Sequence, residues 1–384
     1  MSLPMTNERL LIEAVAEGRV DEVQRLLLVA DARTGNSAAL RCAVATQRSE
    51  IINLLLPHSD AKADNSYVLR HAVEIGNKDL VEMLIPYTDP TALDSEALRY
   101  AAQHGDVDMV ELLLPVSDPL ADHCCALQAA AEHGHNKVVE MLIPISEPQP
   151  ARSSALCFAA KNGHRDVVEL LIPFSDLKAH SQALGWAAFD GRKEIVEFLI
   201  PVSDPGVDES LALCFAAENG HKEIVEILIP FLDPTVHNLR ALRRAAEKGH
   251  TEIVAMLIPV SNVEQDDLWS LCAAAMNGHK EVVELLIPVS DPKAHDSAAL
   301  NCAAVGGHQE IVELLIPVSD VDAAYESLDE AELAMVRAVE AKLKMKELQA
   351  STARIPQSFN QCVDQAKSES QGTAAPQRGQ ARRL

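Results

Sequence analysis

Residues 212–229, ALCFAAENGHKEIVEILI, and residues 241–258, ALRRAAEKGHTEIVAMLI, share a pattern that returns along most of this 384-residue chain. When the chain is aligned on the glycine of this pattern, nine of the ten steps between equivalent positions are 29 residues and one is 28. A fixed period of this kind indicates a solenoid of repeated helical units. The eleven aligned positions are Gly18, Gln47, Gly76, Gly105, Gly134, Gly163, Gly191, Gly220, Gly249, Gly278 and Gly307.

Each unit contains two apolar stripes with helical spacing. Leu98, Ala101 and Ala102 illustrate the first stripe, in which the small alanines allow a neighbouring helix to approach closely. The second stripe follows the glycine, as at residues 224–225 and 228–229. The spacing therefore predicts two short antiparallel helices per unit, with a left-handed glycine at the end of the first. A proline ten residues after the glycine is expected to end the second helix.

The pattern AL-x-x-AA-x-x-GH-x-EIVE-x-LI resembles the ankyrin repeat family, and the resemblance spans residues 10–320. It implies an all-α, ankyrin-type solenoid of about eleven helix-turn-helix units. The period is four residues shorter than the usual one of about 33, and Ser-x-Ala, as at 95–97, replaces Thr-Pro before the first helix. The missing residues fall where the family carries a β-hairpin finger, so we expect a trimmed finger and almost no strand.

The C-terminal part departs from the repeat. Ser327 and Glu330 fit a capping box that opens a helix through about residue 350, and the apolar side of this helix is expected to cap the last repeat in preference to forming a coiled coil. This side carries Leu333, Val336, Val339 and Leu343. The predicted organisation is a lead over 1–9, repeats over 10–320, a cap over 321–350 and a disordered, Ser- and Gln-rich tail over 351–384.

Composition and charge exclude several classes of function. Aromatic residues make up only 3% of the chain, which is low for an enzyme core. From Ala341 onward there are 8 Lys/Arg and 3 Asp/Glu, a net charge of +5, so the chain's formal charge of −24 leaves −29 on residues 1–340. An acidic body of this kind repels nucleic acid and anionic membranes. No apolar run is long enough for the expected core of a signal peptide or for a membrane span, so we expect a cytoplasmic protein with reduced cysteines. We also expect it to be monomeric.

Catalytic and cofactor-binding signatures are missing from the sequence. Six histidines belong to the repeat's own Gly-His pair and are expected to hydrogen-bond between neighbouring units. One group contains metal-ligand residue types, but its adjacent cysteines lack the spacing of a zinc site, so no metal or other cofactor is expected. Its members are His123, Cys124, Cys125, Glu132, His133 and His135. Cys157, Cys214 and Cys272 occupy one helix position in different units and are interpreted as packing residues.

Three functions remain for such a chain. The resemblance favours a scaffold or adaptor that binds a protein on the concave face of the repeats, although a fold alone does not establish a function. A second hypothesis is a secreted bacterial effector that acts on a host protein in the host cytosol and uses the tail for translocation. An enzyme with a site hidden in the repeats is the third, and no departure from the repeat pattern combines a nucleophile with a base.

Large rings and basic residues concentrate on one face of the first helices in the middle of the chain. The positions five, two and one before each glycine share this face, which lines the concave groove in the ankyrin family. Aromatic and arginine side chains dominate binding hot spots, so these residues are the predicted partner-binding strip. The alternative is that the rings only fill space between repeats. The strip comprises Tyr100, Phe158, Trp186, Phe189, Phe215, Arg243, Arg244 and Lys248.

Overall fold

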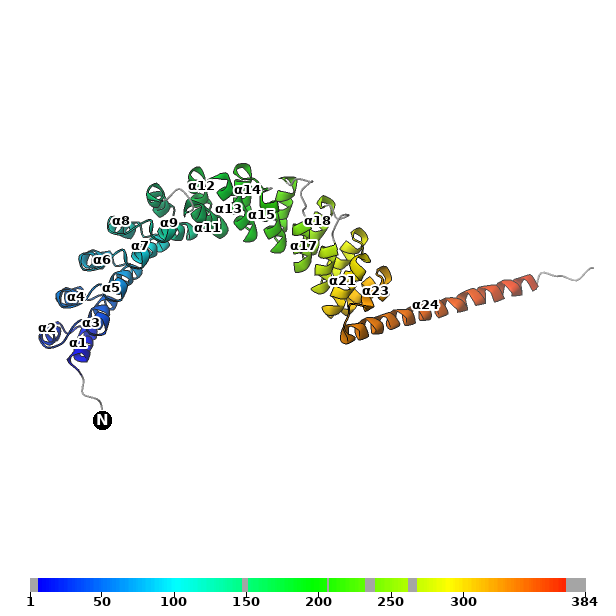
Figure 1. The fold of residues 1–384 in the computed structure, drawn as a ribbon, viewed down its shortest axis with the longest axis horizontal. Coiled ribbons are helices and arrows are strands. Elements are labelled where there is room, and N and C mark those ends of the chain that lie inside the picture. Colours follow the sequence, from blue (N-terminus) through cyan, green and yellow to red (C-terminus); the bar gives the residue numbers. More distant parts are fainter. Residues whose placement is uncertain (1–5, 147–150, 206, 232–238, 262–267, 371–384) are drawn as a thin grey trace, which may run out of the picture. The chain divides into compact units, whose positions relative to one another are not determined.

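The computed structural model describes residues 6–146, 151–205, 207–231, 239–261 and 268–370 (Figure 1). The chain divides into two compact units, unit 1 (Met1–Ala241) and unit 2 (Leu242–Leu384), and each is described by itself. All regular elements in the described ranges are helices, which confirms the all-α prediction and the scarcity of strand. None of these described helices is both long enough and apolar enough to cross a bilayer.

Each repeat has a longer first helix and a second helix of seven residues, as the two stripes predict. The first helices are α1 (Asn7–Glu17), α3 (Thr34–Ala45), α5 (Ala63–Glu74), α7 (Ala92–His104), α9 (Ala121–Glu132), α11 (Ala151–Asn162), α13 (Leu177–Phe189), α15 (Val207–Glu218), α17 (Leu239–Lys248), α19 (Leu268–Met276) and α21 (Ala294–Val305). The second helices are α2 (Val20–Leu26), α4 (Ser49–Leu55), α6 (Lys78–Leu84), α8 (Val107–Leu113), α10 (Asn136–Leu142), α12 (Arg165–Leu171), α14 (Lys193–Leu199), α16 (Lys222–Leu228), α18 (Thr251–Leu257), α20 (Lys280–Leu286) and α22 (Gln309–Leu315).

Within unit 1 the first helices form one layer and the second helices form the other (Figure 1). The core lies between the layers and between successive repeats. Leu98, Ala101 and Ala102 of α7 are at most 1% exposed, and residues 224 and 225 of α16 are similarly buried. Because the buried side chains of the first helices are mostly alanine, these helices pack closely against one another.

The turn between the two helices of a repeat requires a left-handed residue. All eleven aligned positions have a positive φ, including Gln47 with φ of 53°. This conformation is easy for glycine and strained for other residues. In most repeats the second α-helix then gives way to a short 3-10 helix that contains the predicted proline. These are η1 (Leu56–His58), η2 (Ile85–Tyr87), η3 (Ile143–Ile145), η4 (Ile172–Phe174), η5 (Ile200–Val202), η6 (Ile229–Phe231), η7 (Ile258–Val260), η9 (Ile287–Val289) and η10 (Ile316–Val318).

Polar side chains connect neighbouring repeats. The Nε2 atom of His135 lies 2.9 Å from the carbonyl oxygen of Gln103, one repeat earlier, and His164, His221, His279 and His308 make the equivalent contact. These bonds confirm the predicted role for five of the six Gly-His histidines. The hydroxyl of Ser95, which begins Ser-x-Ala, accepts a 2.8 Å hydrogen bond from the backbone N–H of Asp118. This serine is buried and holds the turn that leads into the next repeat.

The C-terminal helix differs from its prediction in two ways. Helix α23 (Val321–Tyr325) precedes α24 (Glu330–Ser370), which begins with a capping box two residues later than expected. The Asp329 carboxylate accepts a 3.0 Å hydrogen bond from the backbone N–H of Glu332, and the Glu332 carboxylate accepts one from the backbone N–H of Asp329. Ser327 instead accepts from the Asn301 side chain.

The second difference is the length of α24. The helix passes the expected end at residue 350 and continues to Ser370. The remainder of the predicted tail, 371–384, lies outside the described residues. Val336 and Val339 of α24, which contacts α21 and α22, are buried, while Met345 and Leu348 are exposed.

Candidate functional site

The site centres on three neighbouring first helices of unit 1, α11, α13 and α15. Helix α13 packs between α11 and α15 because alanine pairs, such as Ala159–Ala160 on α11 and Ala187–Ala188 on α13, are completely buried between the repeats. The opposite face of these helices carries the large rings. The repeat pattern therefore fixes which positions form the core and which face of each helix is left for other contacts.

Three of the predicted ring residues form one cluster. The ring centroids of Trp186 and Phe189 on α13 are 5.8 Å apart. Phe215 on α15 lies 6.0 Å from Trp186 and 5.4 Å from Phe189, and its ring is nearly perpendicular to that of Phe189. These are favourable aromatic separations. The cluster therefore links two repeats, yet Trp186 is still 38% exposed.

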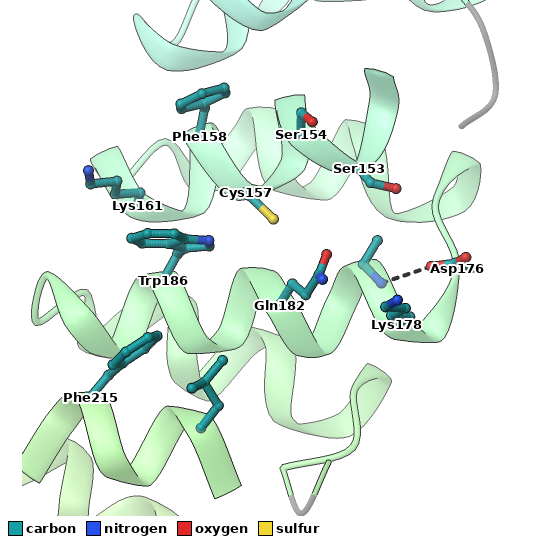
Figure 2. A pocket seen from close by; sticks show the side chains of 12 residues that line it. Ser153, Ser154, Cys157, Phe158, Lys161, Asp176, Lys178, Gln182, Trp186 and Phe215 are labelled. Carbon is teal, nitrogen blue, oxygen red and sulfur yellow. Dashed lines mark hydrogen bonds between the residues drawn. The ribbon is translucent and has the colours of Figure 1, made fainter. Parts of the chain in front are cut away.

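A hollow of about 590 Å³ adjoins this cluster (Figure 2). Phe158 on α11 lines the same hollow as Trp186 and Phe215, so four predicted residues lie in one region. Figure 2 shows Lys161 beside Phe158 and Trp186, and Lys178 at the far end beside Asp176. The lining residues are Ser153, Ser154, Cys157, Phe158, Lys161, Asp176, Lys178, Ala179, Gln182, Trp186, Leu211 and Phe215.

The other predicted residues are on α7 and α17. Tyr100 is on α7, which packs against α5 and α9, and the Arg99 guanidinium lies 4.8 Å from the centre of its ring. Arg243, Arg244 and Lys248 are on α17 and belong to unit 2, where Arg243 and Lys248 are exposed. Arg244 lies 3.5 Å from the Glu247 carboxylate on the same helix, which offsets part of the positive charge expected there.

Several lining residues were missed by the sequence prediction. Lys161 stands two positions before its glycine, on the predicted face, but only the rings and the basic residues of α17 were selected. Ser154 and Gln182 continue the same face by one more helical turn toward the N-terminus. Following the face at intervals of three and four residues along the whole helix would have found all three.

Two thiols, one in each unit, have pKa values shifted in opposite directions. Burial raises the pKa of Cys157 to about 12, so this thiol is neutral and contributes an apolar wall to the hollow. In unit 2, a hydrogen bond with Cys272 lowers the pKa of Cys302 to about 7, against the opposing effect of burial. The pair was not predicted from the sequence, because Cys157, Cys214 and Cys272 were grouped by their shared position six residues before the glycine. Cys302 lies five residues before its glycine.

The group with metal-ligand residue types does not converge. Cys124 is buried in the core, and burial is the main cause that raises the pKa of Cys125. His135 contacts a backbone carbonyl, and its ring stacks on His133 with centroids 6.2 Å apart. Across the part of the chain that the structure describes, no set of three or more His, Cys, Asp or Glu residues is placed to hold a metal ion.

Paired helices, left-handed turns and contacts between neighbouring repeats define a helical repeat protein. The family model for ankyrin repeats in three copies matches residues 69–150, 127–209, 184–267 and 261–329. These matches together cover more than half of the chain, which therefore belongs to the ankyrin repeat family. Among curated proteins, no sequence matches the chain.

Proposed function

We propose that this chain is a scaffold or adaptor that binds a protein partner on the first-helix face, centred on Trp186. Ankyrin repeats are generally protein-binding modules, so membership of the family supports a binding function. The observation that carries the choice of surface is the partly exposed cluster of Trp186, Phe189 and Phe215 beside the hollow. Exposed aromatic side chains bury a large area at a low entropic cost, as binding hot spots do.

The alternative is that these rings serve only to pack neighbouring repeats. The two functions differ in what the loss of Trp186 costs. Removal of a fully buried tryptophan lowers the free energy of unfolding by roughly 3–5 kcal/mol. Removal of a binding hot-spot residue instead weakens the binding free energy by about 2 kcal/mol or more and has a smaller effect on stability.

The test compares Trp186→Ala with Trp269→Ala, in which the second tryptophan of the chain, 65% exposed on α19, is removed as a control. We expect the full-length wild type and the control to retain the same proteins in quantitative pull-downs from matched lysates, and Trp186→Ala to lose at least one of them. Thermal unfolding of all three proteins is measured in parallel. A steep fall in melting temperature for Trp186→Ala with unchanged retention of every partner would contradict the proposal.

A further inference from the structure

The hollow beside Trp186 differs in charge from the rest of the chain. The whole sequence has 57 Asp/Glu and 33 Lys/Arg. The hollow is lined by two lysines, Lys161 and Lys178, and by one carboxylate, Asp176. Asp176 caps α13, where its Oδ1 accepts a 2.8 Å hydrogen bond from the backbone N–H of Ala179. The lining is therefore locally basic within an acidic protein.

The two lysines are placed at opposite ends of an apolar wall. The Nζ atom of Lys161 lies over the Trp186 ring, 5.3 Å from its centre, so its charge is held against the aromatic surface. Lys178 lies at the other end in Figure 2. Phe158, Trp186 and Phe215 supply the large rings along the hollow. A ligand that packs against these rings therefore lies close to a positive charge at each end of the hollow.

Size and chemistry limit what can bind there. A volume of about 590 Å³ lies within the range of about 300–1,000 Å³ that is typical of ligand sites. It has room for a large side chain together with neighbouring groups of a peptide. The neutral Cys157 thiol offers no nucleophile, so binding is expected to be non-covalent. A basic ligand would bring like charges together at Lys161 and Lys178, whereas a carboxylate would be attracted.

We propose that this hollow binds an acidic peptide segment of the protein partner, with an aromatic or aliphatic side chain against the rings and carboxylates near Lys161 and Lys178. This inference rests on the proposed binding function and specifies the chemistry of the partner. The bound segment is selected by the local charge of the hollow and not by the net charge of the protein. Most of the chain's surface would favour a basic segment.

The experiment uses the intrinsic fluorescence of Trp186. Trp186 and Trp269 are the two tryptophans of the chain, so in the full-length Trp269→Phe protein the emission reports Trp186 alone. The probes are two synthetic peptides of twelve residues that lack Trp and Tyr. Each carries a central Phe, flanked by Glu in one peptide and by Lys in the other. At about 150 mM salt the Debye length is about 8 Å, so charges far from the hollow are largely screened.

We expect the Glu peptide to change the Trp186 emission saturably and to bind at least tenfold more tightly than the Lys peptide. Lys161→Glu combined with Lys178→Glu should reverse this preference. The matched control is Lys137→Glu with Lys193→Glu, two exposed residues on second helices that give the same change in net charge. This control should retain the preference for the Glu peptide. Circular dichroism verifies that each variant is folded.

Three results would overturn the inference. They are equal or tighter binding of the Lys peptide by the Trp269→Phe protein, a preference that the control variant changes as much as the variant of the hollow, and no emission change with either peptide. The proposed function is judged separately by the pull-downs. If Trp186→Ala loses a partner but the peptides show no preference for Glu, binding at this face stands and the acidic specificity fails.

Discussion

At the scale of single residues, the aligned glycines meet two different constraints. Gly76 and Gly105 both have a positive φ, of 76° and 69°. A Cβ atom at Gly105 would overlap the imidazole of His135, whereas a Cβ atom at Gly76 would meet no atom within 4 Å. Gly76 is therefore required only for its backbone conformation. Gly105 is required both for its backbone conformation and for the space that the His135 ring occupies.

We expect Gly76→Ala to lower the local free energy of unfolding by about 1–2 kcal/mol, the cost of a left-handed non-glycine residue. Gly105→Ala should cost more, because it also displaces His135 from its hydrogen bond. In a His135→Ala background, which itself costs about 1 kcal/mol, the extra cost should vanish. Hydrogen exchange of the helices around each glycine measures these values. Equal costs for the two glycines in the wild-type background would contradict the overlap.

At the scale of elements, α24 changes its surroundings along its length. Its first turns pack on α21 and α22, where Val336 and Val339 are almost completely buried. Lys342 and Lys346 then pair with Glu313 of α22. In the same part of the helix Met345 and Leu348 are 57% and 61% exposed. The N-terminal part of the helix thus packs on α21 and α22, and the residues from 344 to 351 are exposed.

Truncation of the buried valines should weaken this cap. We expect Val336→Ala and Val339→Ala each to lower the stability of the last repeat by about 1–2 kcal/mol, since each change removes two buried carbon atoms worth roughly 0.8 kcal/mol apiece and leaves a small cavity. The control, Met345→Ala with Leu348→Ala, should leave stability unchanged. Hydrogen exchange of α21 and α22 is the measurement, and similar losses in both cases would exclude the capping role.

At the scale of the whole molecule, stability comes from contacts between neighbouring repeats. Within unit 1, first helices from α1 to α15 contact the first helices beside them, and Gly-His hydrogen bonds of His135, His164 and His221 each join a repeat to the one before it. A protein of this kind behaves approximately as a one-dimensional array, in which a local change spreads only to adjacent units. Damage at one end should therefore fade along the chain.

Removal of the cap tests this expectation. Deletion of residues 330–384 exposes the apolar edge of α21 and α22, so hydrogen exchange should accelerate most in these helices, less in α19 and α20, and not in α1 to α8. Deletion of residues 351–384 alone should leave the exchange of all repeats unchanged. A uniform acceleration across all repeats in the first deletion would show that the chain unfolds as a single cooperative unit.

Periodicity made most of the architecture predictable. The 29-residue period gave the helix pairs, the left-handed turns, the buried alanines and the histidine bonds, because each of these depends on contacts that recur at a fixed distance along the chain. The end of α24 was not predictable in the same way. Its composition suggested disorder after residue 350, and no neighbouring repeat exists there to supply the expected pattern.

The sequence by itself determined which helix face is buried and which face carries the rings, since helical spacing assigns each residue to a side. Only the tertiary structure decided which of these rings meet. It joined Trp186, Phe189 and Phe215, and it placed the Lys161 ammonium over the Trp186 ring. The reason is that periodicity specifies directions around a helix, whereas contacts between side chains of different helices depend on packing distances that the sequence pattern does not contain.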